Sequence, residues 1–180
     1  MAGELQFRTA TVDDAEELRQ LIEAAFRAED SRDGWVDDLG LGSGFRLELD
    51  VVLGIINDSD SAMQMAFDDN GTLLGTVTVA QREQGRGMIF HLAIQQQHQQ
   101  GGLGRKILAY AEDYGQQRWG ITRVGLNALS TRTLLISWYM RRGYVKTGET
   151  TPFPRDKIPD SVTPDALYFV ELEKIVGLES

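Results

Sequence analysis

The apolar residues of the chain recur with two different spacings, which predict helices and strands in succession. From residue 15 to residue 25 they recur at the spacing of one face of an amphipathic helix. Residues 62–67 and 73–80 are apolar runs on either side of Asp68-Asp69-Asn70-Gly71, a sequence typical of a hairpin turn. The predicted order is strand 5–8, helix from 15, helix 47–56, strands 62–67, 73–80 and 88–94, helix 103–118, strand 124–126, helix 131–142, and strands 144–147 and 167–172.

We expect these elements to form one α+β domain over residues 1–180, because no repeat, low-complexity segment or linker interrupts them. The sequence has 42% hydrophobic and 25% charged residues, which is ordinary for a soluble globular protein. It has no cysteine, which excludes disulfides, thiolate metal sites and a cysteine nucleophile. No apolar run approaches the length of a membrane span, so we expect a cytoplasmic protein without a membrane partner.

A glycine-rich segment, Gln99-Gln100-Gly101-Gly102-Leu103-Gly104-Arg105, joins the apolar run at 88–94 to the following helix. Such a junction leaves several backbone N–H groups without partners at one point, and the helix dipole adds partial positive charge there. Glycine allows unusual dihedral angles and lets a phosphate group approach the backbone. The segment therefore predicts a pyrophosphate-binding site.

Three phosphate-binding designs compete for this segment. A P-loop requires Lys and then Ser or Thr after its last glycine, but Gly104 is followed by Arg105-Lys106-Ile107. The dinucleotide fingerprint G-x-G-x-x-G fails because Ile107 occupies the third glycine position. The third design, Q-x-x-G-x-G, is matched in full. An ordinary glycine-rich helix start is the remaining alternative at this point.

A second motif lies downstream, Leu135-Ile136-Ser137-Trp138-Tyr139-Met140-Arg141-Arg142-Gly143-Tyr144. Together with Leu92-Ala93-Ile94 and the glycine-rich segment, in this order, it resembles the GNAT superfamily of acyl-CoA N-acyltransferases. The resemblance covers nearly the whole chain. It implies a GNAT-like mixed, mostly antiparallel central sheet flanked by helices, with a splayed strand pair at the acyl-CoA site.

The resemblance also implies where acetyl-CoA binds as cosubstrate. Backbone groups of Leu92, Ala93 and Ile94 would contact the pantetheine arm, and one N–H there would hold the thioester carbonyl oxygen, where negative charge develops during attack. Substrate recognition would come from residues 26–45 and 146–168, with Glu29, Asp30, Trp35 and Phe153 as candidates. The pyrophosphate would be held by Gln99, Gln100, Gly101, Gly102, Leu103, Gly104 and Arg105.

Tyr139 and His91 are the candidate catalytic residues. A tyrosine at the position of Tyr139 often protonates the leaving thiolate in this family, and a phenol is protonated at neutral pH. Many relatives carry a glutamate as general base where this chain has Met88, which cannot accept a proton. His91 is the nearby titratable group. Strand alternation predicts that it points away from the face of Met88 and Phe90, as a packed histidine, unless a bulge intervenes.

These inferences predict an acetyl-CoA-dependent N-acetyltransferase that acts on a primary amine of a small molecule or peptide, by direct attack in a ternary complex. The net charge of −9 argues against nucleic acid as a partner. Two alternatives stay open: a non-catalytic CoA-binding sensor on the same fold, and a nucleotide-binding module that uses the glycine-rich segment alone. No metal site is predicted, and a homodimer is one alternative for the oligomeric state.

Overall fold

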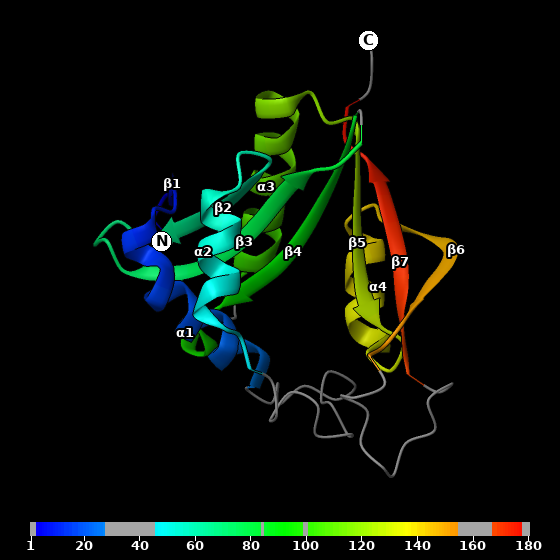
Figure 1. Ribbon diagram of the computed structural model, residues 1–180, viewed down its shortest axis with the longest axis horizontal. Coiled ribbons are helices and arrows are strands. Elements are labelled where there is room, and N and C mark those ends of the chain that lie inside the picture. The colour runs from blue at the N-terminus through cyan, green and yellow to red at the C-terminus, as the bar shows by residue number, and fades with distance from the viewer. Residues whose placement is uncertain (1–2, 28–45, 84, 99–100, 155–166, 178–180) are drawn as a thin grey trace.

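The structure is a computed structural model that describes residues 3–27, 46–83, 85–98, 101–154 and 167–177 (Figure 1). Its helices and strands follow the order expected from the sequence. They are β1 (Gln6–Thr9), the short 3-10 helix η1 (Val12–Asp14), α1 (Ala15–Arg27), α2 (Leu49–Asn57), β2 (Ser61–Phe67), β3 (Leu73–Gln81), β4 (Arg86–Ile94), the 3-10 helix η2 (Gln96–His98), α3 (Leu103–Trp119), β5 (Arg123–Leu129), α4 (Thr133–Arg141), β6 (Val145–Pro152) and β7 (Tyr168–Ile175).

The strands form one seven-stranded sheet in the order β1-β2-β3-β4-β5-β7-β6. All neighbouring strands are antiparallel except β4 and β5, which are parallel. The connection between the two parallel strands contains α3, as a parallel pair requires a crossover. The prediction of a mixed, mostly antiparallel sheet flanked by helices is therefore confirmed.

The helices cover the two faces of the sheet unequally (Figure 1). Helices α1 and α2 pack on the face that we call the front, where Leu18, Ile22 and Val52 join Met63 and Met65 of β2 in one buried cluster. Helices α3 and α4 lie on the opposite face, the back. The back cluster extends from β2 to β7 and holds α3 and α4 against the sheet; its members include Val77, Ile89, Ile107, Leu108, Leu126, Ile136, Tyr139, Tyr144 and Leu172.

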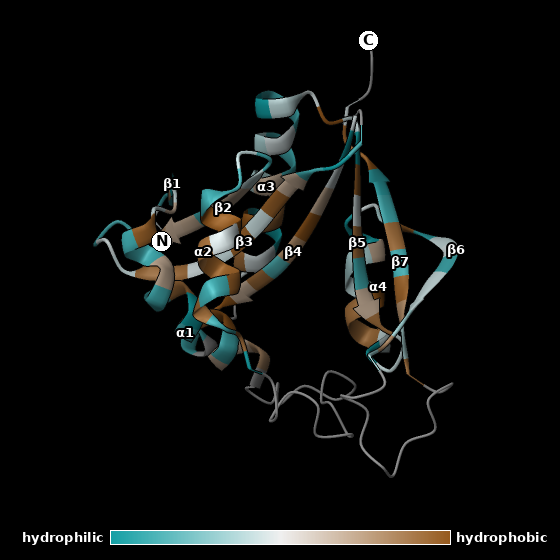
Figure 2. Ribbon diagram, in the orientation of Figure 1, coloured by the Kyte–Doolittle hydropathy of each residue, from teal (hydrophilic) through white to brown (hydrophobic). Residues whose placement is uncertain are grey.

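The front of β5, β7 and β6 differs from the rest of the sheet. Within the described part of the chain, α1 contacts β4 but neither α1 nor α2 packs on these three strands. Figure 2 shows the consequence: α2, β3 and β4 are largely brown, whereas β6 and much of β7 are pale or teal. This polar front face, which no described helix covers, lies directly beside β4.

Several boundaries differ from those expected. Strand β6 continues to Pro152, beyond the end at residue 147 that the sequence predicted. It is an edge strand, where a proline removes no inner ladder hydrogen bond. Helix α3 ends at Trp119, one residue after the predicted end, and Gly120 follows it in a left-handed conformation with φ of 67°. Residues 28–45, most of the first segment predicted for substrate recognition, lie outside the described residues. None of the described helices is long and apolar enough to span a membrane.

Candidate active site

The parallel strands β4 and β5 pair only at one end. Their register runs from Arg86 opposite Arg123 to Met88 opposite Gly125 and then stops. Beyond these pairs the two strands diverge, as Figure 1 shows. The edge of β4 that faces β5 therefore has no ladder partner in β5 from Ile89 to Ile94, which leaves its backbone groups available to a ligand. The splayed strand pair is present.

A β-bulge interrupts β4 inside this diverging segment. Thr78 of β3 pairs with Phe90 and Thr76 pairs with Ala93, so two residues of β4, His91 and Leu92, lie opposite the single Val77. His91 takes the strain of the extra residue, with φ of 53°. It is the only residue other than glycine with positive φ in the described part of the chain. Such a conformation costs free energy and marks places where the backbone is redirected.

The bulge changes the direction of the His91 side chain. Its ring lies 5.0 Å from the ring of Phe90, which is too close for adjacent residues on opposite faces of a strand. It also lies 6.4 Å from the ring of Phe26 in α1, on the front face. The sequence predicted that His91 would point away from the face of Phe90 unless a bulge intervened, and the bulge is the exception that applies. The histidine is nevertheless packed between a helix and the sheet, as expected.

Burial makes His91 a poor base. Its Nδ1 is buried and has no hydrogen-bond partner among the described residues. Burial also lowers the pKa of His91 to about 4, because an imidazolium ion loses its hydration there. The imidazole ring is therefore neutral at neutral pH and accepts a further proton only weakly. His91 therefore serves as a packing group on this geometry.

The glycine-rich segment forms the start of α3. Gly101 and Gly102 have φ values of 86° and 73°, and Gly102 is the residue that precedes the first helical turn. The backbone N–H groups of Leu103 to Arg105 donate no hydrogen bond within the described structure, whereas that of Lys106 bonds to Gly102 at 3.2 Å. Unpaired N–H groups at the positive end of a helix favour an anion.

Side chains from α3, β4 and α4 lie close to two glycines at this helix start. A Cβ atom added at Gly102 would lie 3.8 Å from a guanidinium nitrogen of Arg105, so that side chain lies over the glycine. A Cβ at Gly104 would lie 3.2 Å from Ile94 and 3.5 Å from Trp138. Glycine at 104 thus lets α3 start in contact with both β4 and α4. Gln99 and Gln100, the other predicted contacts of the pyrophosphate, lie outside the described residues.

Tyr139 projects from α4 into the back cluster, which also contains Leu103 at the start of α3 and Leu126 of β5. Its ring packs edge-on against Trp138 at 5.2 Å and Tyr144 at 5.9 Å. Its hydroxyl makes no hydrogen bond within the described part of the chain. Burial raises the pKa of Tyr139 to about 12, so the phenol is fully protonated at neutral pH.

Tyr144 contrasts with Tyr139, because its hydroxyl is fixed. It donates a hydrogen bond of 2.6 Å to Glu112 of α3, whose second oxygen accepts one of 3.0 Å from Lys174 of β7. Burial and the Glu112 carboxylate both raise the pKa of Tyr144 far above that of a free phenol. The three residues connect α3, the end of α4 and β7, and hold the ring against which Tyr139 packs.

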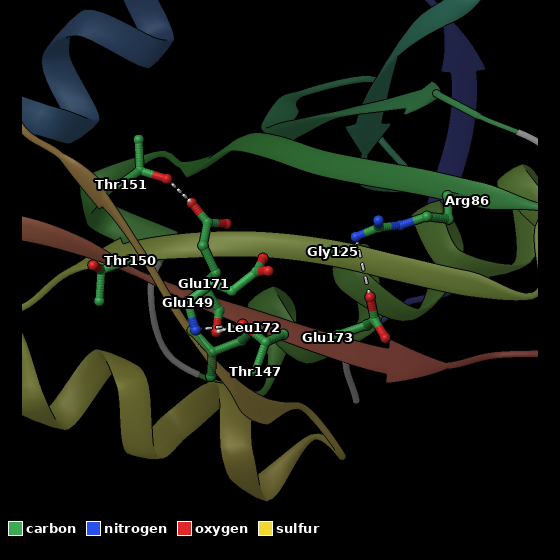
Figure 3. A pocket seen from close by; sticks show the side chains of 9 residues that line it. All are labelled: Arg86, Gly125, Thr147, Glu149, Thr150, Thr151, Glu171, Leu172 and Glu173. Atoms are coloured by element: carbon green, nitrogen blue, oxygen red, sulfur yellow. Dashed lines mark hydrogen bonds and ion pairs between the residues drawn. The ribbon is translucent and has the colours of Figure 1, made fainter.

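Two neighbouring cavities open on the front face where β4 and β5 part. One, of about 520 Å³, is lined by β6 and β7 and contains Glu149, Glu171 and Glu173. The other, of about 420 Å³, contains Met88 and again Glu171. Gly125, which has no side chain, lines both. Figure 3 shows the Glu171 carboxylate directed toward Thr151, away from the Arg86–Glu173 ion pair.

Glu171 lines both cavities, and sequence reasoning did not single it out. It lies within the last predicted strand, but that strand was not ordered relative to β5. In the sheet, β7 lies beside β5, and Glu171 pairs with Asn127 two positions beyond Gly125. The signal in the sequence was the alternation of Glu171, Leu172 and Glu173, which places both carboxylates on one face. Glu29, Asp30 and Trp35 lie outside the described residues, and Phe153 packs on Phe169 at 5.6 Å.

Residues 15–144 match the acetyltransferase (GNAT) family, and the chain belongs to this family. None of the curated proteins matches the sequence. Solved structures share the fold at low sequence identity. The ribosomal-protein-S18-alanine N-acetyltransferase of Escherichia coli has a TM-score of 0.72 at 11% identity, with 98% of this chain and 97% of that chain covered.

Two further acetyltransferases have the same architecture. The spermidine/spermine N-acetyltransferase of Vibrio cholerae has a TM-score of 0.67 at 14% identity, covering 96% of this chain and 93% of that one. The PaiA N-acetyltransferase of Thermoplasma acidophilum, solved with coenzyme A, has a TM-score of 0.66 at 16% identity, covering 96% and 99%. At these identities the likeness shows the fold.

Proposed function

We propose that this protein transfers an acetyl group from acetyl-CoA to a primary amine of a small molecule or peptide. The proposal rests on one observation: two features suited to binding a ligand, on β4 and α3, adjoin each other. The unpaired edge of β4 leads to the glycine start of α3, so one elongated ligand can lie along the strand and place its anionic end on the helix. Acetyl-CoA has this shape and charge distribution.

The residues present fit this cosubstrate. Gly101, Gly102 and the N–H groups of the first turn of α3, which have no partner among the described residues, would hold the pyrophosphate, with Arg105 adding positive charge. The backbone around the bulge, at Leu92 to Ile94, would contact the pantetheine arm. An N–H group there would stabilise the negative charge that develops on the thioester oxygen during attack.

Transfer requires the C–N bond to form and the C–S bond to break, with the sulfur ending as a thiol. Tyr139 supports the second event, because its protonated hydroxyl can donate to the leaving thiolate. A buried phenolate would be unstable at a pKa of about 12, so the phenol must regain its proton at once. The attacking nitrogen must lose a proton as the amide forms, and this proton can replace the one that Tyr139 gave to the sulfur.

Direct attack in a ternary complex is the route that this chain supports. The sequence has no cysteine, so the thiol side chain that would most readily carry an acyl group is missing. The thioester approaches through the gap between β4 and β5, and the amine approaches from the open front face. Holding both reactants in one place supplies much of the rate acceleration.

Thermal unfolding with ligands tests the binding step. Acetyl-CoA at about 100 times its dissociation constant should stabilise the protein by about 2.7 kcal/mol, and ATP and NAD should not. Gly102→Glu should abolish the shift, because it places bulk and negative charge at the helix start. Gly54→Glu is the matched control, since a Cβ at Gly54 meets nothing within 4 Å on α2. A full shift in Gly102→Glu would overturn the assignment of this binding site.

Release of CoA with a panel of amines tests the transfer step. Turnover with at least one amine is the expected result. Binding of acetyl-CoA without turnover of any amine would favour a CoA-responsive regulator, and stabilisation by ATP or NAD in place of acetyl-CoA would favour a nucleotide-binding module.

A further inference from the structure

We propose that Glu171 of β7 accepts the proton of the acceptor amine, in place of the acid that this chain lacks at Met88. The inference rests on the proposed function and names the group that its chemistry still requires. An amine is an ammonium ion at neutral pH and has no lone pair for attack, so a nearby group must remove one proton.

Position is the first argument. Glu171 and Met88 line the same cavity, although they belong to strands far apart in the sequence. That cavity lies on the front face where β4 and β5 part, and the back of the same region is closed by α3, α4 and the buried cluster. An amine that reaches a thioester held between the strands therefore comes from the front and passes Glu171.

The hydrogen bonds of Glu171 leave one oxygen free. Its Oε1 accepts a bond of 2.6 Å from the hydroxyl of Thr151 and one of 3.4 Å from the amide of Asn127. Its Oε2 accepts none from the described residues. The two neutral donors orient the carboxylate without neutralising its charge, so Oε2 keeps lone pairs for an incoming proton.

The other acids of the two cavities are less suitable. Glu173 has both oxygens engaged by guanidinium groups, at 3.2 Å from Arg86 and 3.4 Å from Arg123. Glu149 and Glu83 are exposed on β6 and in a turn. His91 lies on the front face but has its pKa lowered to about 4 by burial, so it takes up a proton poorly. Among the described acids of these cavities, Glu171 alone combines orientation, partial burial and an oxygen that accepts no hydrogen bond from a described residue.

The proposed step is balanced. One N–H bond of the ammonium breaks and its proton moves to Oε2 of Glu171, which gives a neutral amine and a carboxylic acid. The amine nitrogen then forms the bond to the thioester carbon, and the C–S bond breaks as Tyr139 protonates the sulfur. The nitrogen still carries one proton more than the amide, and this proton returns Tyr139 to its neutral form. The proton on Glu171 passes to water through the open cavity, so each turnover releases one proton to the solvent.

The test is the pH profile of kcat/KM for Glu171→Gln, which keeps the size of the side chain and an acceptor for Thr151. At neutral pH we expect a loss of about 10²- to 10⁴-fold. The ratio of wild type to variant should shrink as the pH rises toward the pKa of the free amine, about 10 for an alkylamine, because solvent then supplies neutral amine. A merely structural role would give a ratio that does not change with pH.

Glu149→Gln is the matched control, because it removes one negative charge from the same cavity and should retain the wild-type shape of the profile. Thr151→Val provides a second variant should Glu171→Gln not fold. It removes the 2.6 Å hydrogen bond from an exposed residue and should give a smaller loss with the same pH dependence. An acetyl-CoA thermal shift equal to that of the wild type shows that each variant is folded.

A double variant, Glu171→Gln with Met88→Glu, moves the carboxylate to the other wall of the shared cavity and should restore part of the lost rate. A wild-type pH profile in Glu171→Gln, with active wild-type enzyme, overturns the role of Glu171 and leaves the acetyltransferase proposal intact. Absence of turnover in the wild type, with acetyl-CoA bound, overturns both proposals.

Discussion

The two walls of the gap between β4 and β5 are built from different kinds of groups. The β4 wall beyond Met88 presents backbone, redirected by the bulge at His91, and burial keeps the His91 side chain neutral. The opposite wall, formed by α4, β5 and β7, presents side chains, among them Tyr139 and Glu171. In the proposed reaction, the first wall holds the carbonyl and the second wall handles protons. The comparison teaches that a sheet can separate these tasks by pairing two strands over only part of their length.

The largest effect should come from Tyr139→Phe, which removes a proton donor from the second wall. We expect kcat to fall about 10²- to 10⁴-fold while the affinity for acetyl-CoA stays near that of the wild type. Stability should change little, because the hydroxyl has no hydrogen-bond partner within the described structure. Steady-state kinetics and thermal unfolding measure the two quantities. An unchanged kcat would return Tyr139 to a packing role and erase the contrast between the walls.

His91→Gln should affect stability rather than chemistry. The pKa of His91 is about 4 in the folded protein against about 6.5 when unfolded, so the unfolded state binds more protons between these values. The contribution of the neutral histidine is therefore complete above about pH 6.5 and lost as the pH falls toward 4. Between pH 6.5 and pH 4, the free energy of unfolding should therefore fall by up to about 3 kcal/mol less in the variant than in the wild type.

Denaturant unfolding at several pH values, with His98→Gln as the control, measures this difference. The rise of kcat/KM with pH should persist in His91→Gln, because the proposed acceptor of the amine proton is Glu171. Loss of that rise in a folded variant would place the base on the β4 wall.

The smallest effect should come from Tyr144→Phe, which keeps the ring that positions Tyr139 but removes a buried hydrogen bond to Glu112. We expect the free energy of unfolding to fall by about 2 kcal/mol, because Glu112 loses one of its two partners. The value of kcat should stay close to that of the wild type. A large fall in kcat with unchanged stability would contradict this division between the two tyrosines.

Local signals in the sequence predicted most of the fold. The hairpin at Asp68–Gly71, the glycine start of α3 and the glycine at 120 each follow from the conformations that these residues allow. The amphipathic spacing of α1 and the apolar runs of β2 to β4 predicted which faces would be buried. The two motifs of the family resemblance then predicted the splayed strand pair.

The rest depends on contacts between distant residues. No glycine or proline at the bulge signals it in the sequence. The bulge arises from the way in which the registers of β3 and β4 fit together. The position of Glu171 depends on β7 lying between β5 and β6, which no periodicity within β7 specifies. The proposed proton acceptor could therefore not be identified from the sequence.

The place of β7 in the sheet also has a consequence for biosynthesis. The strand emerges from the ribosome after β6, yet it is inserted between β5 and β6 and pairs with both. A nascent chain can assemble β1 to β4 with their helices early, but β5 and β6 never pair with each other and have no shared partner until β7 arrives. Pairing of strands that lie so far apart in the sequence slows folding, and strand edges stay exposed until the pairing is complete. Shortening the chain by its final strand would thus open the second wall itself, so translation must reach β7 before the proposed proton acceptor exists.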